Sequence, residues 1–92
     1  MPGTDLPPGG LPAPDLPEPD LTVDALGLRC PLPVLRARKR LETLAPGQVL
    51  CLLADDPMAL IDLPHFCGQS GHALVAVTET GSGARFLIRK GG

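Results

Sequence analysis

The sequence predicts an α/β two-layer sandwich, in which two helices cover one face of a four-stranded mixed sheet. Four segments are apolar or alternate between apolar and polar residues, as strands do, and two segments between them carry apolar residues at helical spacing. The resulting order along the chain is β-α-β-α-β-β. Because 92 residues can bury one hydrophobic core and not two, we expect a single domain over residues 21–92, preceded by a tail.

Residues 1–20 are predicted to form this tail, which is rich in proline and expected to be disordered. Seven of the 12 prolines lie there, and proline cannot donate to a regular hydrogen-bond ladder. The tail holds four of the ten acidic residues and no Lys or Arg, which leaves eight basic residues against six acidic ones in the rest of the chain. We expect a passive extension, with a docking segment as the alternative.

The composition excludes several classes of function. The small positive excess in the predicted domain favours contact with an acidic protein surface over direct binding of nucleic acid, and two Phe with no Trp or Tyr leave few rings for base stacking. Three cysteines without a CxxC pair indicate a reducing compartment rather than a disulfide framework. No signal peptide and no apolar run approaching the roughly 20 residues of a membrane span is visible, so we expect a cytoplasmic protein with no membrane contact.

The first half of the domain reads as a strand and a helix. Residues 21–24 alternate apolar and polar before a turn at Gly27. The helix is expected to start at about Pro31 to Pro33, because the missing N–H of proline is tolerated only in the first turn. Its apolar positions recur at helical spacing, and Pro46-Gly47 ends the pattern. Those apolar positions are Val34, Ala37, Leu41 and Leu44.

The second half supplies the remaining strands and a second helix. Residues 49–54 (VLCLLA) form a continuous apolar run, which suits a central strand with neighbours on both edges. Asp56 and Pro57 are typical of a helix N-cap and first position, whereas Pro64 predicts a break before the helix ends near Gly71. Residues 73–78 and 84–89 then read as two strands, joined by a glycine-containing hairpin loop over residues 79–83.

The segment with the clearest chemistry is Arg29-Cys30-Pro31-Leu32-Pro33, between the first strand and the first helix. Cys30 is expected to be exposed beside the free N–H groups and positive end of the helix dipole, next to the cation of Arg29. Both features favour a thiolate, the form that attacks the persulfide of a donor. Cys51, inside the apolar run, is expected in the core, and Cys67 is expected to be mainly structural.

These residues resemble the TusA/SirA-like family of sulfur carriers, whose motif is CPxP. The matching segments are residues 26–29 with CPLP at 30–33, then 54–57, 62–67 and 86–92. The resemblance extends from about residue 21 to the end of the chain. It departs from the family at Leu32, where the best-known members carry an acidic residue, and in the tail.

The resemblance implies a β-α-β-α-β-β fold and a persulfide on Cys30, with Arg29, Pro31 and Pro33 as supporting motif residues. It implies a cysteine desulfurase as sulfur donor and a second sulfur-relay protein as acceptor. The similarity is to the branch whose relay leads toward 2-thiouridine in tRNA, and carriers for molybdenum-cofactor enzymes or for sulfur oxidation are the alternatives. No cofactor and no metal are expected, and an exposed Cys30 is compatible with a monomer.

Three rival interpretations concern other residues. The helix is expected to carry a basic stripe of Arg36, Lys39 and Arg40, which is either a solvated face or a docking surface for the donor. The alternative function is a non-enzymatic binding or regulatory module, in which the stripe would bind an acidic partner without a role for Cys30. The terminal Gly91-Gly92 suggests a ubiquitin-like thiocarboxylate carrier, but the element order disagrees, so we expect a fraying tail. Three further residues invite a metal site, although their spacing matches no usual zinc pattern. They are His65, Cys67 and His72.

Overall fold

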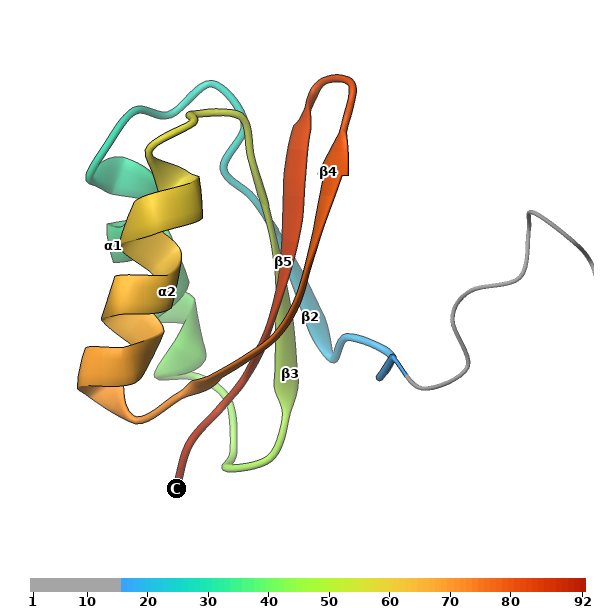
Figure 1. The fold of residues 1–92 in the computed structure, drawn as a ribbon. Coiled ribbons are helices and arrows are strands. Elements are labelled where there is room, and N and C mark those ends of the chain that lie inside the picture. The colour runs from blue at the N-terminus through green and yellow to red at the C-terminus, as the bar shows by residue number, and fades with distance from the viewer. Residues whose placement is uncertain (1–15) are drawn as a thin grey trace, which may run out of the picture.

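The computed structural model describes residues 16–92, whose elements follow the order β-α-β-α-β-β. The elements are β2 (Leu21–Asp24), α1 (Leu32–Leu41), β3 (Val49–Ala54), α2 (Ala59–Ser70), β4 (Ala73–Thr80) and β5 (Gly83–Arg89). Both helices lie against one face of the four-stranded sheet (Figure 1). The predicted α/β two-layer sandwich is therefore confirmed. Within this described part of the chain, no helix is long and apolar enough to cross a membrane.

The sheet has the strand order β2-β3-β5-β4, and it is mixed. β2 pairs with β3 in parallel, while β5 pairs antiparallel with both β3 and β4. β3 thus has a neighbour on each edge, as its continuous apolar sequence predicts. Because β2 and β3 are parallel, the segments that follow them leave the sheet at the same edge, and this edge carries the candidate site described below.

The main core lies between the sheet and the helices. Leu50 and Leu52 of β3 and Phe86 and Ile88 of β5 are fully buried there, and Leu63 of α2 packs on them. Alternate residues of the same strands point to the other face of the sheet. A smaller buried cluster lies on that face. It contains Val49, Cys51 and Leu87.

α2 continues through Pro64 without a break, so the predicted interruption is wrong. Proline inside a helix costs about 3 kcal/mol, because it removes one hydrogen bond and crowds the preceding turn. Here Pro64 lies on the exposed side, and its neighbours Leu63, Phe66 and Cys67 are buried on the core side. Burying a large apolar side chain contributes roughly 1.5–3 kcal/mol, so packing of this face outweighs the local cost.

The ends of α1 and of the hairpin also differ from prediction. α1 ends at Leu41, although Leu44 follows the helical pattern and packs against the core. The amine of Lys90 donates to the carbonyl oxygens of Leu41 (2.6 Å) and Leu44 (3.2 Å), and so satisfies groups that a longer helix would have paired. In the hairpin, β4 and β5 pair as far as Thr80 and Gly83, so the turn is shorter than the predicted loop over residues 79–83.

Both ends of the predicted domain are held by backbone hydrogen bonds to residues far away in the sequence. Most of the predicted tail lies outside the described residues, so its disorder stays a prediction. Its last residue, Asp20, donates its N–H to the carbonyl of Val49 (2.7 Å) and accepts the N–H of Val49 on its carboxylate (2.8 Å). At the other end, the N–H of Gly91 donates to Nδ1 of His72 (3.0 Å). The expected fraying is therefore wrong at Gly91, because His72 holds its backbone.

Candidate functional site

The candidate site lies at the edge of the sheet where β2 and β3 end. Cys30 follows β2 and precedes α1, while Asp55 and Asp56 directly follow β3 and precede α2. The C-terminus lies at the opposite end of the molecule (Figure 1). The parallel pairing of β2 and β3 therefore brings a thiol and two carboxylates together from segments well separated in sequence.

Asp56 fixes the backbone of the cysteine. One carboxylate oxygen accepts the N–H of Cys30 at 2.6 Å, and the other accepts the N–H of Met58 at 3.1 Å. These two backbone hydrogen bonds, with a smaller contribution from the charge of Arg29, lower the pKa of Asp56. With 9% of its surface exposed, Asp56 is a buried charged residue whose hydrogen bonds join the Cys30 loop to the start of α2.

Asp55 holds the preceding part of the same loop. Its carboxylate accepts the N–H of Gly27 at 3.0 Å and pairs with the guanidinium of Arg29 at 3.3 Å. Gly27 adopts a φ of 82°, which a residue with a Cβ rarely adopts. The cation of Arg29 is thus directed to Asp55, and the predicted supporting residue acts on the loop rather than on the sulfur.

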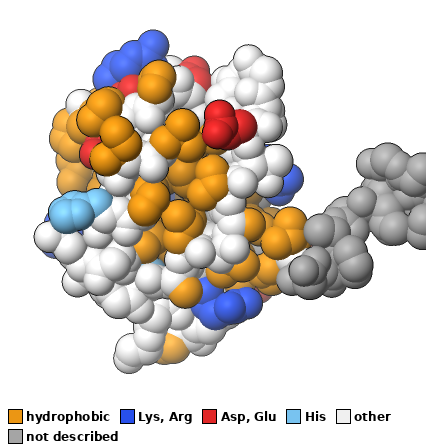
Figure 2. Space-filling model, in the orientation of Figure 1, with side chains coloured by type: hydrophobic (Ala, Val, Ile, Leu, Met, Phe, Trp, Pro, Cys, Tyr) orange, Lys and Arg blue, Asp and Glu red, His pale blue; other side chains and the backbone are white. Residues whose placement is uncertain are grey.

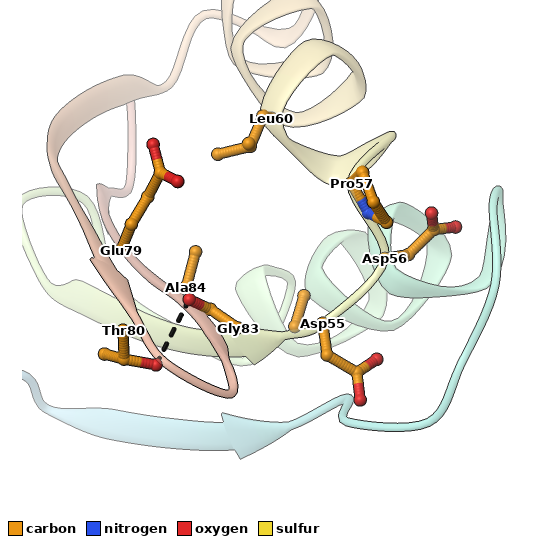
Figure 3. Close-up of a pocket in the computed structure, with 9 residues that line it drawn as sticks. Asp55, Asp56, Pro57, Leu60, Glu79, Thr80, Gly83 and Ala84 are labelled. Atoms are coloured by element: carbon orange, nitrogen blue, oxygen red, sulfur yellow. Dashed lines mark hydrogen bonds between the residues drawn. The ribbon is translucent and has the colours of Figure 1, made fainter.

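A hollow of about 230 Å³ lies beside this loop, between the start of α2 and the β4–β5 hairpin. Figure 3 shows the carboxylates of Asp55 and Asp56 pointing away from its centre, whereas Leu60 and Ala84 form part of an apolar wall. Cys30 does not line it. The two carboxylates therefore serve the cysteine loop and not this hollow.

The Cys30 side chain is exposed, as predicted, but it points toward α2. Its Sγ donates to Oδ2 of Asp62 at 2.8 Å. This hydrogen bond raises the pKa of the Cys30 thiol, and partial desolvation and the negative charges of Asp62 and Asp56 act in the same direction. The prediction that the surroundings of Cys30 favour the thiolate is therefore wrong.

The prediction is wrong because it requires free N–H groups at the start of α1 and a free Arg29 cation beside the sulfur. These N–H groups are missing or bonded to other atoms, and Arg29 pairs with Asp55. The N–H of Leu32 donates to the carbonyl of Arg29 at 2.8 Å, and Pro31 and Pro33 have no N–H. The start of α1 has no side-chain cap and no acidic residue in its first turn. The two prolines that place the helix start near Cys30 thus also remove N–H groups that would have stabilised a thiolate there.

The other two cysteines are buried, with exposed fractions of 1% for Cys51 and 2% for Cys67. Cys51 lies on the sheet face away from the helices, where Nη2 of Arg85 approaches its sulfur at 3.8 Å. Burial raises the pKa of Cys67 to about 11. The core assignment of Cys51 is confirmed, and Cys67 is also buried in the core; Cys30 is the one exposed thiol of the three.

The predicted docking residues share one exposed face of α1. Arg36, Lys39 and Arg40 border a common surface hollow with Thr43. A second hollow joins this basic stripe to apolar residues near Cys30, and it is lined by Leu28, Leu32, Leu35, Arg36 and Lys39. On the side of the molecule seen in Figure 2, hydrophobic side chains also gather over the upper part of the helical layer, where α2 begins. The surface beside the cysteine is therefore apolar next to Cys30 and basic further along α1.

Three acidic residues of the site have no predicted role beside Cys30. The sequence predicts Asp55 and Asp56 only as N-cap and first-turn acids of the second helix, and it predicts no separate role for Asp62. The parallel arrangement of the first and third elements could have indicated Asp56, because it places the ends of both strands at one edge. Asp62 could not be found in this way, since its approach to Cys30 depends on the packing of α2 against α1.

The residues of the alternative metal site do not converge. His65 is exposed, Cys67 is buried, and Nδ1 of His72 accepts the N–H of Gly91. Within residues 16–92, no three His, Cys, Asp or Glu side chains are grouped so that they could hold a metal ion.

Comparisons with known proteins agree on one family. Residues 21–90 match the family model described as sulfurtransferase TusA. The crystal structure of a SirA-like protein from Desulfitobacterium hafniense is similar, with a TM-score of 0.67 and 32% sequence identity. That match covers 78% of this chain and 99% of the SirA-like protein.

Proposed function

The chain belongs to the TusA sulfurtransferase family, and from this premise we propose that it carries sulfur as a persulfide on Cys30. The family supports a role as a sulfur carrier. The observation that carries the assignment to Cys30 is that this residue is the exposed thiol, whereas Cys51 and Cys67 are buried. Its backbone is held by Asp56 at 2.6 Å, so the sulfur is presented from a fixed loop.

The proposed reaction moves one neutral sulfur atom between thiols. The Cys30 thiol loses its proton to solvent, and the sulfur then attacks the outer sulfur of the donor persulfide. A new S–S bond forms on Cys30 as the S–S bond of the donor breaks, and the donor leaves as a thiolate that takes up a proton. The same exchange, with Cys30 as the leaving thiol, passes the sulfur to the acceptor. No external oxidant or reductant is needed.

We propose a cysteine desulfurase as the donor and a second sulfur-relay protein as the acceptor. The basic residues Arg36, Lys39 and Arg40 would dock an acidic patch of the donor, while apolar residues such as Leu32 cover the surface nearer the sulfur. We propose that the protein works in the cytoplasm as a monomer, without a cofactor. The pathway proposed for the sulfur is 2-thiouridine synthesis in tRNA.

A two-step labelling experiment tests the relay. The full chain is loaded with a cysteine desulfurase and radiolabelled cysteine, separated from the donor, and mixed with a purified relay protein. We expect the label on wild type and then on the relay protein, and no label on Cys30→Ser. If Cys30→Ser passes on as much label as wild type, the assignment to Cys30 is wrong. If wild type takes no label from an active desulfurase, the proposed carrier function is rejected in favour of a non-enzymatic binding module.

Label that loads but does not move to a tRNA-directed relay protein would reject only that pathway. In that case relay proteins for molybdenum-cofactor enzymes and for sulfur oxidation are the next acceptors to be mixed with the labelled chain.

A further inference from the structure

The contact between Cys30 and Asp62 is not needed to expose the thiol or to fix its backbone. Asp62 is in the first turn of α2, where its own N–H donates to the carbonyl of Met58 at 2.8 Å. Its half-buried carboxylate receives the Cys30 thiol at 2.8 Å. Two acids from the α2 side therefore hold this residue, with Asp56 binding the backbone N–H and Asp62 binding the sulfur.

The charges around the sulfur are unbalanced. From the α2 side, Asp62 and Asp56 both bring negative charge. From its own loop, the cation of Arg29 is paired with Asp55 at 3.3 Å. The start of α1 brings no charge, because residues 31–35 are all proline, leucine or valine. An anion on the Cys30 sulfur would therefore face like charge, which disfavours the ionised form.

We propose that Asp62 is a positioning residue that holds the unloaded sulfur of Cys30 as a hydrogen-bonded thiol and destabilises the persulfide anion formed on loading. The part that concerns the loaded state rests on the proposed function, whereas the part that concerns the free thiol does not. The consequence is a carrier that binds its sulfur weakly and releases it readily to an acceptor.

The two states of the sulfur differ in what they offer Asp62. The free thiol has a proton and donates it in the 2.8 Å hydrogen bond. A persulfide is more acidic than the parent thiol, because two sulfur atoms share the negative charge, and once ionised it has no proton to donate. Two unit charges about 4 Å apart in water repel enough to shift an equilibrium about fivefold. Asp62 therefore favours the unloaded state over the loaded one by about this factor.

The first arm of the test follows alkylation of Cys30 by iodoacetamide as a function of pH, on full-length wild type, Asp62→Asn and Glu42→Gln. Glu42 is an exposed acid at the far end of α1, so its variant controls for loss of one negative charge. We expect Asp62→Asn to titrate at lower pH than wild type and to react several-fold faster at pH 7, with Glu42→Gln unchanged. Superimposable profiles for wild type and Asp62→Asn would overturn the proposal.

If Asp62→Asn does not fold, native and unfolded chains that keep Asp62 test the same point. Cys30 is then alkylated in the native chain and in the urea-unfolded chain of a variant in which Cys51 and Cys67 are both serine. We expect the apparent pKa of Cys30 to be higher in the native chain, and an equal or lower native pKa would overturn the proposal.

The second arm measures how sulfur partitions between the protein and a small thiol. Wild type and Asp62→Asn are loaded by a desulfurase and brought to equilibrium with glutathione, and the loaded fraction is read by intact mass. We expect Asp62→Asn to retain about five times as much persulfide relative to free thiol as wild type. Equal partition would overturn the part that concerns the loaded state. If neither chain gains sulfur, the proposed function fails, while the first arm still decides the role of Asp62 toward the thiol.

Discussion

The carboxylate of Asp56 accepts the backbone N–H of Cys30 at 2.6 Å, although the two residues are separated by 26 positions in the sequence. The contact exists because β2 and β3 are parallel neighbours, so the loops that follow them leave the sheet at the same edge. It links the geometry of the sheet to the placement of the sulfur. Changing either the sheet or the carboxylate should therefore affect the cysteine loop.

Asp56→Asn should lower the stability of the fold at neutral pH, because an amide N–H₂ cannot accept both backbone donors. The pKa of Asp56 is lowered in the folded protein, so its stabilising contribution is present above the unfolded value of about 3.9 and is lost as the pH falls through the folded value. We expect wild type to lose urea resistance on acidification through this range and the variant to lose less. Urea midpoints at pH 7 and pH 3 measure this, and equal losses in both chains would contradict it.

Gly83→Ala should destabilise the hairpin. Gly83 has a φ of 151°, and a Cβ placed there would lie 2.5 Å from the carbonyl oxygen of Ala54. We expect a loss of about 1–3 kcal/mol in the free energy of unfolding. Gly81→Ala is the matched control, since a Cβ at Gly81 meets no atom within 4 Å. Similar urea denaturation curves for the two variants would show that the constraint at Gly83 is absent.

Leu63→Ala should be among the most destabilising single changes in α2. Leu63 is 0% exposed and packs in the main core, so its truncation should cost about 2–5 kcal/mol. Leu35→Ala removes the same atoms from a side chain that is 48% exposed, and it should change stability by less than about 0.5 kcal/mol. Chemical denaturation distinguishes the two, and equal effects would place Leu63 outside the core.

Native protein should be alkylated at Cys30 and spared at the other two cysteines. Cys51 and Cys67 are buried, and the pKa of Cys67 is raised to about 11, so at pH 8 it is both inaccessible and protonated. Mass spectrometry after iodoacetamide treatment that is long enough to modify the largely protonated Cys30 thiol should show one modified thiol per chain in buffer and three in urea. Native Cys30→Ser should show none, and modification of Cys67 in that variant would contradict the assignment.

Reversing charge on the α1 stripe should slow loading by the donor. The double variant Arg36→Glu/Lys39→Glu is expected to reduce the rate of sulfur uptake about tenfold at low salt, with less difference at high salt, because charge steers the encounter. Arg89→Glu is the control. Arg89 is an exposed residue of β5, and its neighbour Ile88 faces the helices, so the Arg89 side chain points to the other side of the sheet. Equal rates for the stripe variant and wild type would remove these residues from the donor interface.

The strands and the first helix could be predicted because local pattern and tertiary structure agree there. The apolar run at residues 49–54 is buried because β3 is central, and the prolines at 31 and 33 flank the start of α1 as proline geometry requires. Pro64 shows the opposite case. Its local preference is to break α2, but burial of Leu63 and Phe66 on the same helix decides the outcome, and a local pattern does not report the strength of packing.

The site could be predicted only in part, for a related reason. The position and exposure of Cys30 follow from its loop and from the prolines around it. Its protonation depends on Asp62, which lies 32 positions further along the chain and reaches the sulfur through the packing of α2. The engagement of Arg29 by Asp55 is equally tertiary. Sequence features around a thiol therefore located the exposed cysteine without giving its charge state.

The central claim is that Cys30 is the residue that carries sulfur. Intact-mass spectrometry of wild type and Cys30→Ser, after incubation with a cysteine desulfurase and cysteine in the absence of reductant, tests it most directly. We predict that wild type gains the mass of one sulfur atom, that a thiol reductant removes it, and that Cys30→Ser gains nothing. A gain of the same mass by Cys30→Ser, or no gain by wild type in the presence of an active donor, would contradict the claim.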